Sequence, residues 1–215
     1  MAVTPCLRSI IGPSRAFAIR LREDIQRAVR FIRHHGERFG IRPERIGGIG
    51  GSSGGHLIAM VGVMDGKGDT DDPDPVNRQS AKLQCIIVRA APVDLIRMTM
   101  TQEFGINTIT SLMGLPLSPR DAKTTPQYQA YWKASPINYV SADDPPFLMI
   151  HGDADRNVPI LESESMERTL QSAGVAARLI RIPGGAHGPT FPGAKNLPDL
   201  AGEMTRWLDS HLRGQ

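Results

Sequence analysis

The stretch Gly47–Leu57, GGIGGSSGGHL, places two neighbouring serines among glycines between a strand pattern and a helix pattern. The apolar residues Ile46 and Ile49 indicate a short strand, and the apolar run Leu57–Met60 indicates a buried helix. Glycines at such a junction permit a sharp turn with positive φ and let the helix pack closely on the strand. A serine in this turn is held at the end of the strand and at a helix N-terminus, where negative charge is favoured.

Short apolar runs and longer amphipathic runs alternate along the rest of the chain. This alternation predicts a mostly parallel sheet with helices on both faces, and continuously apolar strands indicate burial on both sides. We expect strands over residues 2–8, 45–50, 83–91, 146–151 and 177–182, and helices over residues 22–39, 53–64, 160–173 and 197–212. The sequence therefore predicts one α/β domain over residues 1–215, with 94–144 as a candidate cap or insert.

Composition excludes several classes of function. The net charge of +3 is small and spread along the chain, which argues against a nucleic-acid partner. The sequence has no apolar run near the ~20 residues that a membrane span needs, and no pattern typical of a signal peptide. Two cysteines, Cys6 and Cys85, are too few for a disulfide framework. A cytoplasmic location is expected.

The nucleophile-elbow pattern Gly-x-Ser-x-Gly fits the serine stretch twice, beginning at Gly50 or at Gly51. The nucleophile would be Ser52 in the first register and Ser53 in the second. One alternative is a Gly/Ser-rich loop without chemistry. Another is a dinucleotide-binding loop that begins at Gly48, although Ser53 occupies its third glycine position. No Gly-Lys-Ser/Thr follows, which argues against a phosphate-binding P-loop.

An acid and a base follow later strands. Asp153 and Asp155 come directly after the apolar run that ends at His151, although solvated turn residues or a helix cap would look the same. His187 lies in a glycine-rich loop after the last predicted strand, where glycines leave its ring little local packing. Serine, acid and histidine thus occur in the chain order of α/β-hydrolases, each after a separate strand.

The chain resembles the α/β-hydrolase serine esterases, especially the subgroup similar to bacterial carboxylesterases and to feruloyl and acetyl-xylan esterases. The resemblance rests on PERIGGIGGSSGGHL (43–57), APVDL (91–95), ASPINYVSADDPPFLMIHGDADRNVPI (134–160) and IPGGAHG (182–188). It covers nearly all of the chain from about Phe17 onward. It implies an α/β-hydrolase fold and the hydrolysis of short-chain carboxylic esters through an acyl-enzyme intermediate, without a metal or a cofactor.

The family motifs also assign roles to residues. In the family the elbow reads Gly-x-Ser-x-Gly-Gly-His-Leu, so matching Gly54–Leu57 puts the nucleophile at Ser52. The N–H of Ser53 would then serve the oxyanion hole. The family acid in His-Gly-x-x-Asp-x-x-Val-Pro falls on Asp155, which leaves the aspartate two residues earlier as a spectator, and the family base falls on His187.

The substrate side of the site is less well defined by sequence. Gly51 precedes the nucleophile and is expected to contact the substrate. Met98, Phe104 and Met113 lie in the 94–144 insert and could line an apolar acyl pocket for small acyl groups. The alternative for these three residues is a satellite core that contacts no substrate.

One family feature is not found in the sequence. Such enzymes carry a His-Gly-Gly-Gly-type turn upstream of the elbow, which supplies a second oxyanion donor, and the first family strands are expected to be absent with it. The strand over 45–50 would then be an edge, covered by residues 2–8 or by a second copy in a homo-oligomer. The turn Gly12–Ser14 could replace the missing donor.

Two rival functions remain open at this point. One is a small peptidase of the same fold. The other is a non-catalytic or weakly active binding protein that keeps the serine, the acid and the histidine but lacks the oxyanion turn.

Overall fold

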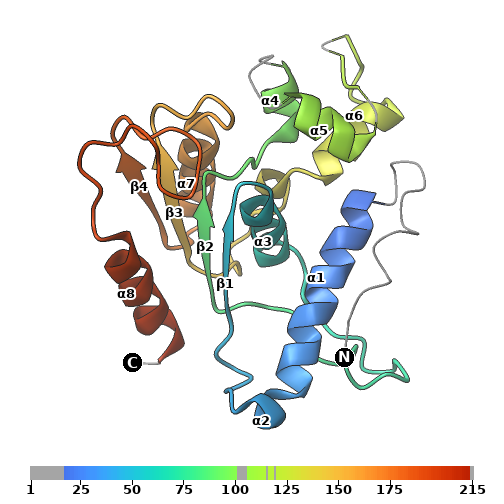
Figure 1. Cartoon of the computed structure of the whole chain (residues 1–215). Coiled ribbons are helices and arrows are strands. Elements are labelled where there is room, and N and C mark those ends of the chain that lie inside the picture. The colour runs from blue at the N-terminus through green and yellow to red at the C-terminus, as the bar shows by residue number, and fades with distance from the viewer. Residues whose placement is uncertain (1–16, 101–105, 115, 119, 214–215) are drawn as a thin grey trace, which may run out of the picture.

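A computed structural model describes residues 17–100, 106–114, 116–118 and 120–213 of the chain (Figure 1). Its centre is a four-stranded parallel sheet in the order β1-β2-β3-β4. The strands are β1 (Gly47–Gly51), β2 (Cys85–Arg89), β3 (Phe147–Gly152) and β4 (Ala177–Ile182). Because all four run the same way, their carboxyl ends meet at one edge of the sheet. These four strands confirm the predictions made from apolar runs, and the strand predicted over 2–8 lies outside the described residues.

Helices connect and flank the strands. They are α1 (Phe17–His34), α2 (Gly36–Phe39), α3 (Ser53–Val63), α4 (Leu95–Met100), α5 (Ile106–Met113), α6 (Pro126–Lys133), the 3-10 turn η1 (Pro136–Tyr139), α7 (Leu161–Ser172) and α8 (Leu200–Leu212). Among the described helices, none is long and apolar enough to cross a membrane. The helix predicted over 22–39 is divided at His35, and α2 ends at Gly40, whose φ of +64° is left-handed.

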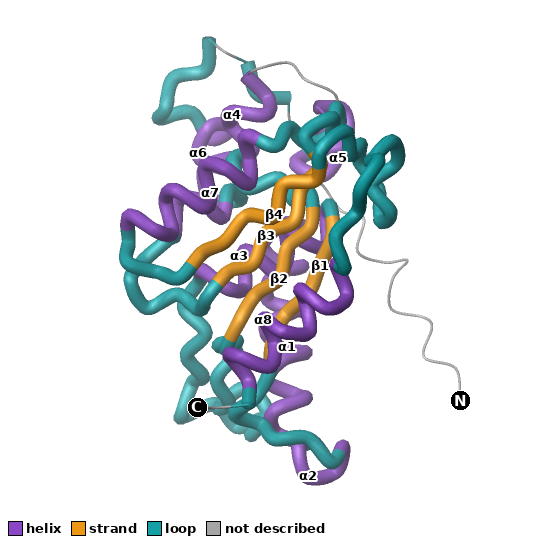
Figure 2. Tube along the Cα trace, turned by 90° about the vertical axis from the view of Figure 1, so that its left-hand side faces the viewer, coloured by secondary structure: helices purple, strands orange, loops and turns teal. Residues whose placement is uncertain are grey.

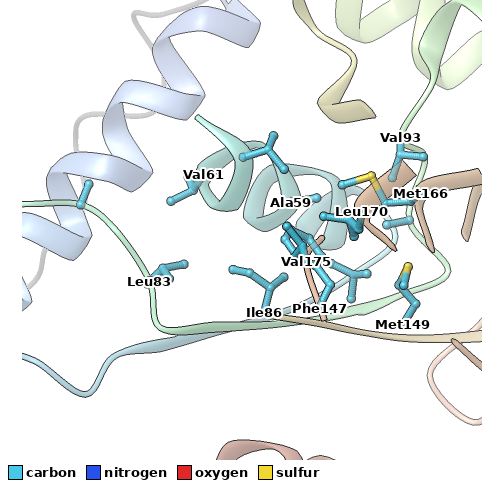
Figure 3. Packing of buried hydrophobic residues seen from close by; sticks show 14 of the residues in the cluster. Ala59, Val61, Leu83, Ile86, Val93, Phe147, Met149, Met166, Leu170 and Val175 are labelled. Atoms are coloured by element: carbon cyan, nitrogen blue, oxygen red, sulfur yellow. The ribbon is translucent and has the colours of Figure 1, made fainter. Parts of the chain in front are cut away.

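Helices cover both faces of the sheet, as predicted. On one face, side chains from β2 and β3 such as Ile86, Phe147 and Met149 point toward α3 and α7 (Figure 3). On the other face, the alternate residues Ile87 and Leu148 belong to a second cluster, which packs against α8. Every residue of β3 is buried, as expected for a central strand of a parallel sheet. The protein therefore has the predicted α/β architecture.

The apolar residues at helical spacing in the 22–39 segment are only partly buried. Val29 is buried and Ile25 is half-buried, but Ile32 and Phe39 are 39% and 47% exposed. Gln26 is buried instead, because its side-chain amide donates to the Asp65 carbonyl oxygen at 3.0 Å. A polar residue with a specific partner is thus buried on α1 beside the apolar ones.

The 94–144 insert forms α4, α5 and α6, which gather above the carboxyl ends of the strands in both views (Figures 1 and 2). Their buried side chains make a satellite core of their own. Met98 and Met113 lie in this core and are 3% and 4% exposed. Their packing matches the alternative stated for them above, while Phe104 lies outside the described residues.

β1 is the edge strand of the sheet that the described residues form. It pairs with β2 alone among them, and Ile49 is 53% exposed on it. Coverage of this edge by residues 2–8 or by a second copy stays a prediction.

Candidate active site

Ser52 occupies the turn between β1 and α3. Its φ of +52° and ψ of −124° are rare for a residue with a side chain. Two backbone hydrogen bonds hold this conformation, because the Ser52 N–H donates to the Arg89 carbonyl oxygen at 2.8 Å and the His56 N–H donates to the Ser52 carbonyl oxygen at 2.9 Å. The Ser52 side chain makes no capping bond to α3, so its hydroxyl is available to other partners.

Gly50 lets the helix follow the strand at very short range. A Cβ atom at this position would lie 2.3 Å from the Gly54 carbonyl oxygen and 2.7 Å from the Gly55 nitrogen. These are backbone atoms of α3, which cannot rotate away as a side chain could. Only glycine fits here, for the reason of close approach that the sequence suggested.

We therefore expect Gly50→Ala to lower the free energy of unfolding by about 3 kcal/mol, because the helix must shift away from the strand. Gly54→Ala is the matched control, since a Cβ at Gly54 would have no atom of the described part of the chain within 4 Å. Its stability should be unchanged or higher by less than about 1 kcal/mol. Urea denaturation followed by circular dichroism measures both, and equal midpoints for the two variants would contradict the packing argument.

Asp155 follows β3 and its carboxylate is completely shielded from solvent. One oxygen, Oδ1, accepts the N–H groups of Asn157 and Val158 at 2.8 and 2.9 Å. The other, Oδ2, lies 2.6 Å from His187 Nδ1 and 3.4 Å from His151 Nε2. Burial alone would raise the pKa of Asp155, but these hydrogen bonds hold that pKa below its ordinary value, so the group stays an anion.

His187 lies in the loop after β4 and joins the acid to the serine. Its Nδ1 faces Asp155, and its Nε2 lies 3.0 Å from the Ser52 hydroxyl oxygen. An ionised carboxylate can only accept, so Nδ1 carries the proton and Nε2 presents a lone pair. The Ser52 hydroxyl therefore donates to His187, although the two residues are 135 positions apart in the sequence.

The loops that carry Asp155 and His187 are joined to each other. A Cβ atom at Gly152 would lie 2.0 Å from the Gly185 carbonyl oxygen, so the two loops touch through their backbones. Asp153 Oδ1 accepts the Gly184 N–H at 2.7 Å, and the Asp153 N–H donates to Ile182 at 3.1 Å. Asp153 thus ties the loop that carries Asp155 (the acid loop) to the loop that carries His187 (the histidine loop).

The N–H of Ser53 belongs to the first turn of α3. The first N–H groups of a helix have no acceptor inside it and point out of its N-terminus, here directly beyond Ser52. An anion that forms on a group bound to Ser52 would meet these donors. The second donor proposed at Gly12–Ser14 lies outside the described residues.

His56, in the first turn of α3, is buried and hydrogen-bonded. Its Nδ1 lies 3.0 Å from the Pro92 carbonyl oxygen. Burial lowers the pKa of His56 and outweighs that hydrogen bond, which favours the charged form, so the ring is held neutral. Within the described residues, no group of three or more His, Cys, Asp or Glu side chains could hold a metal ion.

Sequence reasoning gave His151 and Arg89 no role in the site. His151 is fully buried behind Asp155, where Nδ1 meets the Ser163 hydroxyl at 2.7 Å and Nε2 meets the Val158 carbonyl oxygen at 2.8 Å. Its position directly before the glycine of the acid motif was the one available signal. Arg89 ends β2, and the run CIIVR gives no indication of its contacts.

The sequence of this chain matches a known protein family. The BD-FAE family model matches residues 15–170, a range that contains Ser52 and Asp155 and stops before His187. The probable carboxylic ester hydrolase LipM of Mycobacterium tuberculosis is 30% identical over 149 residues, which are 65% of this chain and 31% of LipM. The chain thus spans about a third of the length of this curated relative.

Solved structures agree with this match. The acetyl ester-xyloside bifunctional hydrolase of Caldicellulosiruptor lactoaceticus has a TM-score of 0.76 and 28% identity, over 88% of this chain and 65% of that one. A truncated form of a carbohydrate esterase from gut microbiota has a TM-score of 0.71 and 29% identity, over 90% of this chain and 68% of that one. The fold is that of the α/β-hydrolases.

Proposed function

The chain belongs to the BD-FAE family, and from this premise we propose that it is a serine hydrolase of short-chain carboxylic esters. Ser52 is the proposed nucleophile, His187 the general base and Asp155 the acid that orients the base. The single observation that carries this proposal is the unbroken series of hydrogen bonds from Asp155 through His187 to Ser52, at 2.6 and 3.0 Å. A Gly/Ser loop without chemistry has no need of such a series.

The proposed reaction has two halves. Ser52 Oγ attacks the ester carbonyl carbon while its proton moves to His187 Nε2, and the carbonyl oxygen becomes an oxyanion near the Ser53 N–H. The intermediate collapses, the C–O bond to the alcohol breaks, and His187 gives its proton to the departing oxygen. Water, deprotonated by His187, then attacks the acyl-enzyme and releases the carboxylic acid and Ser52. Asp155 stays ionised throughout and stabilises the charged imidazole.

The proposed substrates are small-molecule esters with short acyl groups. LipM is named as a carboxylic ester hydrolase, and the solved neighbour from Caldicellulosiruptor lactoaceticus as an acetyl ester-xyloside hydrolase. We place the acyl group beside Gly51 and beneath the insert. Met98 and Met113 would shape this pocket by packing the insert, as they are buried in its core. The single domain over 1–215, a cytoplasmic location and a homo-oligomer remain parts of this proposal.

The test is initial-rate hydrolysis of p-nitrophenyl acetate, butyrate and octanoate by the purified chain. We expect kcat/KM to be highest for acetate or butyrate and to fall for octanoate, because a short pocket cannot bury the longer chain. Acetyl p-nitroanilide serves as the amide control, and preference for it would favour a peptidase. Background rates on every ester would favour the non-catalytic binding protein.

A further inference from the structure

Arg89 contacts both the turn that carries the proposed nucleophile and the loop that carries the proposed base. It is the last residue of β2 and pairs in register with Gly51 on β1. Its carbonyl oxygen accepts the Ser52 N–H at 2.8 Å, one of the two bonds that hold the turn. The main chain of Arg89 therefore helps to fix the position of Ser52.

The side chain of Arg89 reaches the loop that carries His187. Nη2 donates to the carbonyl oxygen of Pro189, which lies 100 positions further along the chain. The guanidinium carbon also lies 5.0 Å from the centroid of the Phe191 ring, and that ring is 1% exposed. One residue thus contacts the backbone of the nucleophile and two residues just beyond the base.

The histidine loop requires contacts of this kind. Gly184, Gly188 and Gly193 have φ values of +70°, +144° and +86°, and Phe191 has the positive φ of +51°. A chain with this many left-handed positions has many alternative conformations when it is free. Asp153 holds the limb before His187 through the Gly184 N–H, as described above. Arg89 holds the part of the loop after His187, so the histidine lies between two segments that are each fixed by a contact.

The guanidinium occupies this place at a cost. Its Nε is buried and has no hydrogen-bond partner among the residues that the structure describes, and burial lowers the pKa of Arg89. An aliphatic side chain of similar length would avoid this cost but could not bond Pro189 or pair with the Phe191 ring. The directed contacts are what arginine adds here.

We propose that Arg89 is a positioning residue. It holds residues 188–192 of the histidine loop beside the turn that carries Ser52, and so keeps His187 within hydrogen-bond reach of Ser52. Its effect on catalysis rests on the function proposed above. The hold on the loop itself does not depend on that function and can be measured separately.

The first experiment measures the loop directly, by amide hydrogen exchange with mass spectrometry. Arg89→Met keeps the aliphatic stem and removes the guanidinium. We expect faster exchange in peptides that cover 184–194 and unchanged exchange in β3. The reason is that backbone hydrogen bonds within the loop, such as the one from the Ala186 N–H to the Pro192 carbonyl oxygen at 2.8 Å, open more often once the Arg89 contacts are lost. Arg178→Met is the control, since Arg178 pairs with Glu203 on α8. Unchanged exchange over 184–194 in Arg89→Met would overturn the proposal, whether or not the protein is active.

The second experiment measures the consequence for catalysis. We expect Arg89→Met to lower kcat for p-nitrophenyl acetate by about 10-fold or more, because misplacement of a catalytic group costs rate steeply. KM should stay within about twofold, since no substrate contact is removed. Arg89→Lys should recover part of kcat, because lysine can reach Pro189 or the ring but not both. A kcat equal to wild type in Arg89→Met would overturn the catalytic role of Arg89. An inactive wild type would overturn the proposed function, and the hydrogen-exchange result would then decide whether Arg89 holds the loop.

Discussion

Ser52→Ala is expected to reduce ester hydrolysis by about 10⁴-fold or more, because it removes the atom that forms the acyl-enzyme. The hydroxyl of Ser52 is the only part of the residue that the substitution deletes, and it is the group that donates to His187 Nε2. The positive φ of Ser52 remains with alanine, so the turn keeps its strain and its backbone bonds. Initial rates on p-nitrophenyl acetate measure the loss.

Ser53→Ala is the matched control, one residue further along. The Ser53 side chain is exposed, and alanine retains the N–H that we place in the oxyanion hole. Activity should therefore stay within about threefold of wild type. An inactive Ser53→Ala beside an active Ser52→Ala would move the nucleophile by one position and contradict the assignment. Labelling with a fluorophosphonate probe, followed by peptide mapping, identifies the reactive serine independently of turnover.

Asp155→Asn should lower kcat by about 10⁴-fold, because it changes which ring nitrogen of His187 carries the proton. The oxygen that accepts the N–H groups of Asn157 and Val158 must remain an oxygen, which places the new NH₂ group at the position of Oδ2. That NH₂ faces His187 Nδ1 and donates to it. The ring then carries its proton on Nε2, where it can no longer accept the proton of Ser52.

Asp153→Asn makes the same chemical change two residues earlier. Its Oδ1 only accepts the Gly184 N–H, and an asparagine oxygen accepts equally well, so kcat should stay within about threefold of wild type. The pH–rate profiles of both variants should be recorded between pH 5 and pH 9 on p-nitrophenyl acetate. An Asp155→Asn enzyme with the wild-type profile and rate would show that Asp155 does not orient the base.

Local sequence patterns were sufficient for most of the fold. β4 runs over Ala177–Ile182 as predicted. α8 presents Leu200, Met204, Trp207 and Leu208 to the sheet, because burial of one side imposes a period of 3.6 on a helix. α8 begins later than predicted because Asp199 caps it, accepting the Gly202 N–H at 2.9 Å. The helices of the insert were missed, since short amphipathic segments that pack on one another carry a weak pattern.

The order of elements could be read from the sequence, and so could the positions of Ser52, Asp155 and His187 after strand ends. The reason is that a strand, a glycine turn and a helix each depend on residues close together in the chain. The contacts among those residues could not. Ser52 meets His187 across 135 positions, and Arg89 meets Pro189 across 100, so these contacts follow from strand pairing and loop packing rather than from any local pattern. For the same reason, Asp153 and Arg89 acquire their roles only in the folded chain, where backbone groups of a distant loop become their partners.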